Sequence, residues 1–345
     1  MNNKTSNITK SIYEKMNRNI HNTKNHPIEI VKNKIYNYFG DSFEKFDNLS
    51  SKVNVLDNFD KLLIPKTHPA RSFSDTYYFD ENTCLRTHTS AHQNELLSKG
   101  YKKFLVTGDV YRKDEIDSSH YPVFHQMEGV CVVEDNQDVK EEFINTIKGL
   151  VEFLFPGCEY RFNDDYFPFT NPSFEVEVKF NGEWLEILGG GIVQNEILKN
   201  NNLENKKAWA FGLGLERLAM ILFKIPDIRY FWTTDERFLN QFKSGEIIEF
   251  KEYSKYPPCH KDISFWLNED YNYNNFCEIV REMGGDFVEN ISLIDNFTNS
   301  KTNKTSHCYR ITYRSNDRSL TNEEVDLVQN KVRNLIQNEL NLELR

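Results

Sequence analysis

The segment FEVEVKFNGEWLEILGGGIV occupies residues 174–193 and carries the strongest fold signal in the chain. Apolar side chains alternate with charged ones in its first half, at Phe174, Val176, Val178 and Phe180. This period of two predicts a strand with one buried face. The following pair Asn181-Gly182 favours a two-residue hairpin, so EWLEILGGGIV is expected to return as the partner strand. Hairpins join antiparallel neighbours, and we therefore expect an antiparallel sheet and not a doubly wound parallel one.

Other segments extend this pattern. KKFLVTGDVYR (102–112) and VFHQMEGVCVVE (123–134) read as further strands, and GLGLERLAMILF (212–223) as a Gly-rich turn that leads into an apolar helix. PIEIVKNKIYNYF (27–39) has helical spacing with Pro27 in its first turn. SAHQNELL (90–97) reads as a helix with Ser90 as its N-cap. The predicted fold class is α+β, with an antiparallel sheet flanked by helices.

The pattern of predicted helices and strands changes after residue 245. The order of predicted elements becomes strand, helix, strand, strand, helix, which is typical of the ferredoxin-like split arrangement. Its last helix opens on a capping box, with Thr321 as cap and Glu324 at the third position. We therefore expect a basic N-terminal arm or leader remnant at 1–25, a main domain at 26–245 and a ferredoxin-like domain at 246–345.

Composition excludes some classes of protein. The chain of 345 residues has a net charge of −10, which argues against a strong, non-specific nucleic-acid binder but leaves room for a local basic face. It contains no run of 18 apolar residues, so we expect no membrane span. The cysteines form no CxxC pair and no zinc-like spacing, and we expect reduced thiols at Cys84, Cys131, Cys158, Cys259, Cys277 and Cys308.

The N-terminus is basic and poor in acids. Only Glu14 opposes the five cations of the first 27 residues, which are Lys4, Lys10, Lys15, Arg18 and Lys24. Such a composition fits an organelle transit peptide. A flexible arm, or what remains of a longer leader, fits it equally well.

Polar residues that could form a binding or catalytic site gather in two segments of the sequence. In RTHTSAHQ (86–93), His88, Ser90 and Gln93 precede a helix; alone, such residues are more often caps and surface groups. Between 108 and 129, an Arg-containing strand leads through a polar loop to a strand on which Phe124, Gln126 and Glu128 share one face. A ring, an amide and a carboxylate on one face indicate a site for a nucleotide and an amine. The alternative is that Arg112 simply pairs with a neighbouring acid on an exposed sheet.

Two further clusters are weaker on their own. Phe167 and Phe169 flank Pro168 and would suit the walls of an aromatic pocket, although core packing is the commoner role. In GLGLERL (212–218), the glycines allow close backbone approach, but no third glycine supports a dinucleotide motif.

Taken together and in this order, the clusters resemble the class II aminoacyl-tRNA synthetases, with their motif 2 in YRKDEID…HYPVFHQMEG and their motif 3 in AFGLGLERLAM. HTSAHQ, YFPFTNPS, WLEILGGG and IPDIRYF narrow the resemblance to phenylalanyl-tRNA synthetases of the single-chain mitochondrial type. Residues 17–35 and 58–72 look like the helix and strand of motif 1. The segment from YPPCHKDISFW to TYRSNDRSLTNEEV is similar to the family's anticodon-binding domain. The resemblance covers roughly residues 15 to 345.

The resemblance implies a role for each matching residue. Arg112 would hold the α-phosphate of ATP, and Phe124 would stack on adenine with Arg217 on its other face. Asp114 stands where the class usually has Glu for contact with the adenine amino group, and Glu115 is the alternative. Glu186 is a candidate ligand of ATP or Mg²⁺. Residues that would line the amino-acid site are His88, Ser90, Gln93, Gln126, Glu128, Phe167, Phe169 and Ala210, with Gln126 and Glu128 on the ammonium group and Ala210 at the end of the pocket.

The same resemblance implies the partners and the reaction. Phenylalanine, ATP with Mg²⁺, and tRNA(Phe) would be bound by a monomer in the mitochondrial matrix, and phenylalanyl-adenylate would form before transfer to the tRNA. Candidates for tRNA contact are Arg310, Arg314 and Arg318, although exposed arginines often serve solubility alone. Two alternatives remain at this point. The chain could be the catalytic α-subunit of a heterotetrameric synthetase, or a non-catalytic paralogue; such paralogues usually lack an arginine at position 112 or 217.

Overall fold

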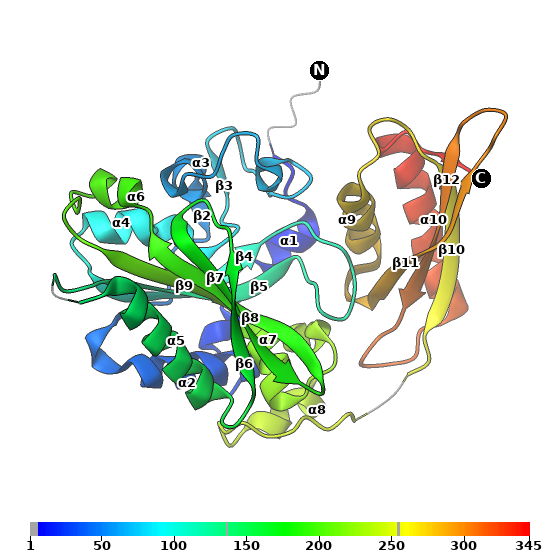
Figure 1. Ribbon diagram of the computed structural model, residues 1–345. Coiled ribbons are helices and arrows are strands. Elements are labelled where there is room, and N and C mark those ends of the chain that lie inside the picture. Colours follow the sequence, from blue (N-terminus) through cyan, green and yellow to red (C-terminus); the bar gives the residue numbers. More distant parts are fainter. Residues whose placement is uncertain (1–5, 136, 254–255) are drawn as a thin grey trace.

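The computed structural model describes residues 6–135, 137–253 and 256–345, which form a larger domain and a smaller C-terminal one (Figure 1). The larger domain is built on a seven-stranded sheet in the order β1-β4-β5-β9-β8-β7-β6. Its strands are β1 (Glu44–Phe46), β4 (Lys103–Tyr111), β5 (Val123–Val132), β6 (Tyr160–Asp165), β7 (Thr170–Phe180), β8 (Glu183–Val193) and β9 (Ala208–Gly214). The predicted antiparallel sheet is confirmed, with β1 added in parallel at one edge.

The β7–β8 hairpin forms as its sequence predicts. Phe180 pairs with Glu183, and the two residues between them both have positive φ, 52° at Asn181 and 88° at Gly182. A two-residue turn of this kind matches the twist of the flanking strands, and asparagine and glycine tolerate its backbone angles. Val176 and Val178 are buried in the core, as the alternation requires.

Helices cover one face of the large sheet and only part of the other. On the first face, α2 (Pro27–Phe39), α5 (Val139–Leu154) and α7 (Leu215–Phe223) bury their apolar stripes against strand residues of the main core. On the second face, the described helices that pack against the strands are the short α4 (Gln93–Ser98) and α6 (Asn195–Asn200), at one end. The middle of β5, β8 and β9 on this second face is left for a cavity.

Several short elements complete the larger domain. They are α1 (Lys10–Lys15), α3 (Val55–Asn58), α8 (Glu236–Leu239) and a small ribbon of β2 (Lys52–Asn54) with β3 (Thr83–Leu85). None of the described helices combines the length and apolar composition that a membrane span needs. The six cysteines are all free in the structure.

Three local expectations differ from the structure. Residues 10–25 are not a loose arm, because Ile12 and Ile20 are buried in the main core. Ser90 caps no helix; it lies inside a 3-10 turn, Thr89–His92, that precedes α4. Residues 58–72 contain 3-10 turns and no strand, since Pro65 and Pro69 lack the N–H groups that a strand ladder uses.

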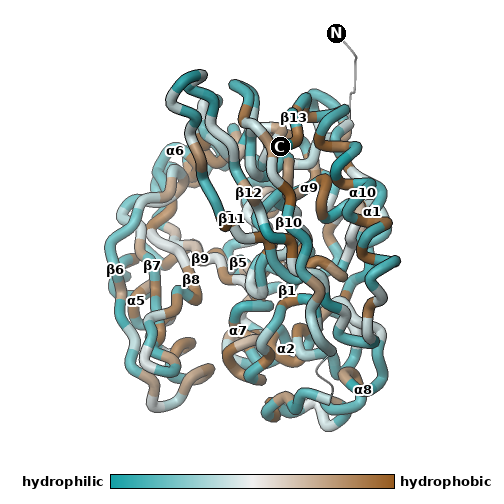
Figure 2. Tube along the Cα trace, turned by 90° about the vertical axis from the view of Figure 1, so that its right-hand side faces the viewer, coloured by the Kyte–Doolittle hydropathy of each residue, from teal (hydrophilic) through white to brown (hydrophobic). Residues whose placement is uncertain are grey.

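The C-terminal domain has the ferredoxin-like order. Its elements are β10 (Cys259–Trp266), α9 (Tyr273–Gly284), β11 (Val288–Thr298), β12 (Thr305–Tyr313), α10 (Asn322–Glu339) and β13 (Glu343–Leu344). The strands lie in the order β11-β12-β10-β13, and both helices pack on one face around their own core. The predicted capping box is confirmed, since Thr321 accepts from the N–H of Glu324 and Glu324 accepts from that of Thr321. Figure 2 looks onto this domain and shows β11, β12 and β10 side by side.

Candidate functional site

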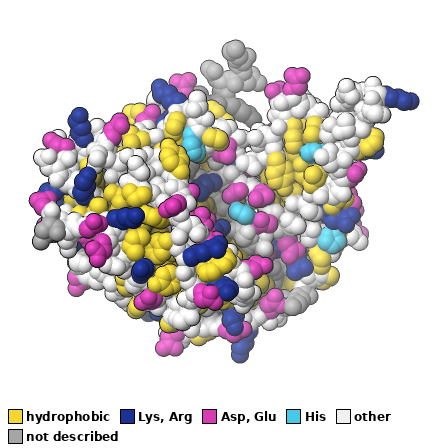
Figure 3. Space-filling view, viewed as in Figure 1, with side chains coloured by type: hydrophobic (Ala, Val, Ile, Leu, Met, Phe, Trp, Pro, Cys, Tyr) yellow, Lys and Arg dark blue, Asp and Glu magenta, His cyan; other side chains and the backbone are white. Residues whose placement is uncertain are grey.

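A cavity of about 520 Å³ opens on the uncovered face of the large sheet. Strands β5, β8 and β9 form its floor, and the β4–β5 loop (residues 112–122) borders it. Figure 3 shows acidic and basic side chains close together around the hollow between the two domains. The residues predicted for the site that line this cavity are His88, Ser90, Arg112, Asp114, Gln126, Glu128, Phe167, Phe169, Glu186 and Ala210. Segments that lie far apart in the sequence therefore meet in one place.

Arg112 is fixed at the start of the β4–β5 loop. Its Nε donates to the carbonyl oxygen of Thr87 at 2.8 Å, and its guanidinium carbon lies 5.3 Å from the centre of the Phe124 ring. Phe124 itself is not among the cavity-lining residues but supports one of them from the neighbouring strand. The guanidinium is thus held at one edge by a carbonyl and at one face by a ring, which orients its remaining N–H groups.

Arg217 does not line the cavity, but it forms an exposed pair with Glu186, which does. Nη1 of Arg217 donates to the carbonyl oxygen of Glu186 at 3.2 Å and to its Oε2 at 3.3 Å. Both side chains are about half exposed, so the ion pair itself is weak. Either group can therefore exchange its partner for a ligand at little cost.

Glu128 is the most perturbed acid of the cavity. Its side chain is buried and one oxygen, Oε2, has no hydrogen-bond partner among the described residues. Burial raises the pKa of this carboxyl to about 8, although a hydrogen bond from Ser90 partly opposes the shift. The Oε1 atom of the neighbouring Gln126 accepts a hydrogen bond from the N–H of Thr89 at 3.0 Å. The amide nitrogen of Gln126 therefore faces Gly212. A buried carboxyl and an amide on one strand face suit a group with several N–H donors.

His88 is neutral in this setting. Burial, together with the nearby charge of Arg112, lowers the pKa of its imidazole to about 3. Gln93, by contrast, lies at the start of α4, is buried, and does not line the cavity; its Oε1 has no partner among the described residues. His88 is therefore uncharged at neutral pH.

Two parallel rings form an apolar wall. The centres of Phe167 and Phe169 are 5.8 Å apart with planes 8° from parallel. Gly189 lies under this wall, because a Cβ there would approach Cζ of Phe167 to 2.8 Å. Ala210 is 5% exposed and lies on β9, opposite Gly191 on one side and Val130 on the other. Small residues on the strands and large rings above them leave a flat apolar slot.

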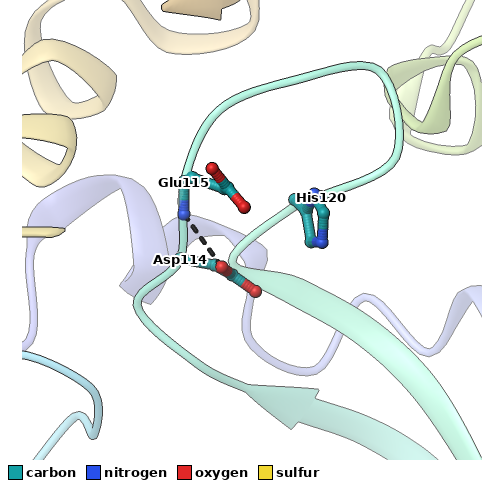
Figure 4. Close-up of side chains that lie close together, drawn as sticks. All are labelled: Asp114, Glu115 and His120. Carbon is teal, nitrogen blue, oxygen red and sulfur yellow. Dashed lines mark hydrogen bonds between the residues drawn. The ribbon is translucent and has the colours of Figure 1, made fainter.

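The β4–β5 loop carries a cluster that the sequence did not single out. Ligand atoms of Asp114, Glu115 and His120 all lie within 4.8 Å of one another (Figure 4). Asp114 accepts from the N–H of Glu115 at 2.9 Å, while the His120 ring bonds to Asp117 at 2.7 Å, which raises its pKa. The sequence places His120 in the same polar loop as Arg112. It does not show that the His120 ring lies close to Asp114 and Glu115.

The C-terminal domain contacts the same loop. Arg281 of α9 donates from Nη2 to the carbonyl oxygens of Asp114 at 2.7 Å and Glu115 at 3.3 Å. The side chain of Ile116 is buried in the core of the C-terminal domain, and its carbonyl accepts from the N–H of Ile291 at 3.1 Å. Asn274, also from α9, lines the cavity. Sequence reasoning missed these contacts, because nothing in a single sequence pairs α9 with a loop so much earlier in the chain.

The three arginines expected to contact RNA are paired with acids. Nε and Nη2 of Arg310 each lie 2.8 Å from an oxygen of Asp262, while Arg318 donates to Glu324 at 2.8 and 3.1 Å. Arg314 lies 3.3 Å from Glu289. These contacts partly neutralise each cation, and the three acids belong to three different elements, β10, β11 and α10.

Comparisons with known proteins agree with this geometry. Residues 10–242 match the family described as tRNA synthetases class II core domain (F), and residues 254–345 match the Ferredoxin-fold anticodon binding domain. The phenylalanine–tRNA ligase of Arabidopsis thaliana chloroplasts and mitochondria is 55% identical over 99% of this chain and 83% of its own length. The mitochondrial enzyme of Dictyostelium discoideum is 46% identical over 98% and 89%, and that of Saccharomyces cerevisiae 37% identical over 99% and 92%.

The α-subunit alternative is disfavoured. A phenylalanine–tRNA ligase α-subunit from Prochlorococcus marinus matches only 54% of this chain, at 43% identity. The mitochondrial relatives match almost all of it, including the ferredoxin-fold domain. The chain therefore belongs to the organellar phenylalanine–tRNA ligases, within the class II synthetase family.

Proposed function

We propose that this chain attaches L-phenylalanine to tRNA(Phe) at the expense of ATP, through a phenylalanyl-adenylate. A carboxylate oxygen of phenylalanine attacks the α-phosphorus, and the bond to pyrophosphate breaks. A ribose hydroxyl of the terminal adenosine, the 2′-OH in this family, then attacks the adenylate carbonyl and AMP leaves. The observation that carries the proposal is the meeting of Arg112, Glu128 and the Phe167–Phe169 wall in one cavity.

Gln126 and Glu128 bind the ammonium group in this proposal. Before the substrate binds, Glu128 is protonated at neutral pH, because its pKa is about 8. An ammonium ion beside it favours the carboxylate, so phenylalanine binding releases the proton. Ser90 and the neutral His88 also line the cavity.

The benzyl ring enters the slot between the phenylalanine wall and the floor. Phe167 and Phe169 contact the ring, and Ala210 closes the end of the pocket. An apolar slot without hydrogen-bond partners stabilises phenylalanine by burial of its ring. It disfavours the tyrosine hydroxyl, which would lose its water there.

ATP lies toward the β4–β5 loop. Arg112 contacts the α-phosphate and stabilises the charge that develops during attack. Phe124 stacks on adenine with Arg217 over the other face, and Asp114, or Glu115 beside it, accepts from the adenine amino group. Arg217 is free to take this place because its contact with Glu186 is exposed and long.

Magnesium would accompany ATP. Glu186 presents a carboxylate to the cavity, and oxygen donors of this kind are what Mg²⁺ prefers. The ion would neutralise phosphate charge when bound.

The C-terminal domain serves tRNA recognition, with Arg310, Arg314 and Arg318 as candidate contacts. We further propose that the enzyme acts as a monomer in the mitochondrial matrix. Light scattering on the eluting peak of the purified chain distinguishes a monomer from a dimer or tetramer.

The decisive test is phenylalanine-dependent exchange of labelled pyrophosphate into ATP by the full chain. Exchange with phenylalanine, and far less with tyrosine or leucine, is expected. Charging of tRNA(Phe) should follow when the transcript is added. Exchange that does not depend on phenylalanine would overturn the proposal.

A further inference from the structure

One face of the C-terminal sheet carries an aromatic row. Helices α9 and α10 pack on the face that carries Phe265 and Tyr309. Neighbours in a strand point to opposite faces, so Trp266 lies on the other one. In the pairing of the three strands, Trp266 is opposite Ser306 and Ser306 is opposite Phe297. A small residue thus lies between two rings on three adjacent strands.

Arg345 lies across this row. Its guanidinium carbon is 5.6 Å from the centre of the Trp266 ring and 4.6 Å from that of Phe297, and its Nη1 donates to Ser306 Oγ at 2.9 Å. The two rings are 6.3 Å apart, edge to face. We call Trp266, Phe297 and Arg345 the aromatic platform. Phe297 is 40% exposed, so part of the platform is open to the outside.

Two lysines stand beside the platform. Lys301 and Lys304 lie in the loop between β11 and β12, directly beyond the row of Phe297 and Ser306. This hairpin projects at the outer end of the domain (Figure 1), and dark blue side chains mark the outer tip in Figure 3. Lys304 lies 3.3 Å from Glu343 with both side chains more than half exposed, which is a weak pair.

The surroundings make this patch stand out. From residue 246 onward the chain has 12 Lys and Arg against 17 Asp and Glu, so a polyanion needs a local basic site. Arg310 is engaged by Asp262 on both oxygens, roughly 13 Å further along β12 at 3.3 Å per residue. The aromatic platform combines rings, a guanidinium and lysines, and single-stranded RNA is bound by this combination of stacking and charge.

We propose that the aromatic platform stacks an unpaired anticodon base of the tRNA, while Lys301 and Lys304 contact the adjoining phosphates. The inference rests on the proposed function and names the RNA subsite for it. A base is flat and tolerates an arginine face or a ring face equally. The platform faces away from α9, the helix that contacts the cavity, so the RNA-reading surface and the adenylate site lie on opposite sides of this domain.

The test compares full-length variants in two assays. Phe297→Ala should lower kcat/KM for tRNA(Phe) by about tenfold or more, the loss typical of one stacked base, and leave pyrophosphate exchange unchanged. Trp266→Phe should retain most charging, because a ring remains. Phe153→Ala is the matched control: Phe153 is 42% exposed and has Lys34 over its ring at 4.6 Å, but it lies on α5 of the larger domain.

A second RNA separates stacking from a structural role. On a tRNA(Phe) whose anticodon nucleotides are abasic, wild type and Phe297→Ala should charge equally poorly. An equal loss on the normal and the abasic tRNA would overturn the proposal, as would normal charging by a folded Phe297→Ala/Arg345→Ala variant. Failure of the wild type to catalyse exchange would instead count against the proposed function and would be seen before any variant is made.

Discussion

The carboxylate of Glu216 accepts two hydrogen bonds from His125, one from its backbone N–H and one from its ring Nδ1, each at 2.7 Å. Glu216 opens α7 immediately before Arg217, and His125 lies on β5 between Phe124 and Gln126. Both side chains are buried, and the His125 ring also stacks on Trp232 at 5.9 Å. The pair thus connects α7, which carries Arg217, to β5, which carries Phe124 and Gln126.

Glu216→Gln should slow adenylate formation and destabilise the fold together. The amide keeps the size of the side chain but is a weaker acceptor, and loss of a hydrogen bond to a charged group costs about 1.5–3 kcal/mol. Pyrophosphate exchange and the Tm are the measurements. Glu183→Gln, on the exposed start of β8, is the control and should change neither. Wild-type values of both for Glu216→Gln would show that the pair does not position Arg217.

Arg112→Ala should abolish most exchange while leaving the fold intact. The guanidinium contributes to transition-state stabilisation, and such charge-assisted contacts are worth roughly 2–4 kcal/mol. Arg161→Ala is matched to it, since Arg161 also lies over an aromatic ring, Trp184 at 4.3 Å, but on an exposed edge strand. Arg217→Ala should resemble Arg112→Ala. Near-normal exchange in the Arg112 variant would exclude the assigned role.

Glu128 should make phenylalanine binding depend on pH. Because the pKa of its carboxyl is about 8, the required carboxylate becomes more abundant as pH rises from about 6.5 to 8. The KM for phenylalanine should fall over this range, and binding near neutral pH should release a proton, measurable by calorimetry in buffers of different ionisation enthalpy. A KM that stays flat across this range contradicts the assignment.

Glu128 should also make the stability of the fold depend on pH. A carboxyl whose pKa is raised in the folded protein gives stability that is full below the unfolded pKa and is lost as pH rises through about 8. Glu128→Gln does not titrate, so its Tm should exceed that of the wild type by a margin that grows from about pH 5 to pH 8. Each tenfold difference between the folded and unfolded acid dissociation constants corresponds to about 1.4 kcal/mol at most. A margin that does not vary with pH would mean that Glu128 is ionised in the free protein.

Ala210→Gly should admit para-substituted rings. Removing the methyl group lengthens the pocket, so para-chlorophenylalanine and para-bromophenylalanine become substrates and tyrosine improves. An apolar pocket rejects an added hydroxyl by only about a hundredfold, so small changes matter here. The measurement is kcat/KM for para-chlorophenylalanine relative to phenylalanine. Ala208→Gly, two residues along the same strand and fully buried, is the control. An unchanged ratio in a folded Ala210→Gly protein would remove Ala210 from the end of the pocket.

A chain truncated after Phe250 should lose tRNA charging entirely and keep part of its exchange activity. The remaining exchange should show a raised KM for ATP, because Asp114 and Glu115 lose Arg281 and Ile116 loses its buried place. Arg281→Ala in the full chain should raise the same KM, by a smaller factor. Unaltered ATP kinetics in both proteins would show that the contact does not shape the ATP site.

Local patterns predicted most of the fold and part of the site. Alternation at 174–180, the Asn181-Gly182 turn and the Thr321 capping box each concern residues close in sequence, and each is confirmed by the structure. The same holds for Gln126 and Glu128, which reach one cavity because they are two residues apart on one strand. These features depend on residues that lie close together in the sequence.

Long-range partners escaped prediction. Serine is a common helix N-cap, yet Ser90 lies inside a 3-10 turn and its side chain hydrogen-bonds to Glu128. Arg310 and Arg318 look like free cations in the sequence, but each meets an acid across a strand or a turn. Trp266 and Arg345 are far apart in the sequence, and only the strand register brings their neighbourhoods together.

Asn274 belongs to the C-terminal domain but lines the cavity of the larger one. A small molecule that fills the cavity in this arrangement therefore touches both parts of the polypeptide. Its affinity would report on where the RNA-binding domain sits, and an inhibitor built against Asn274 would hold that domain in place. A compound that binds the Asn274 side chain could therefore block tRNA charging without competing with adenine or phenylalanine for their parts of the site.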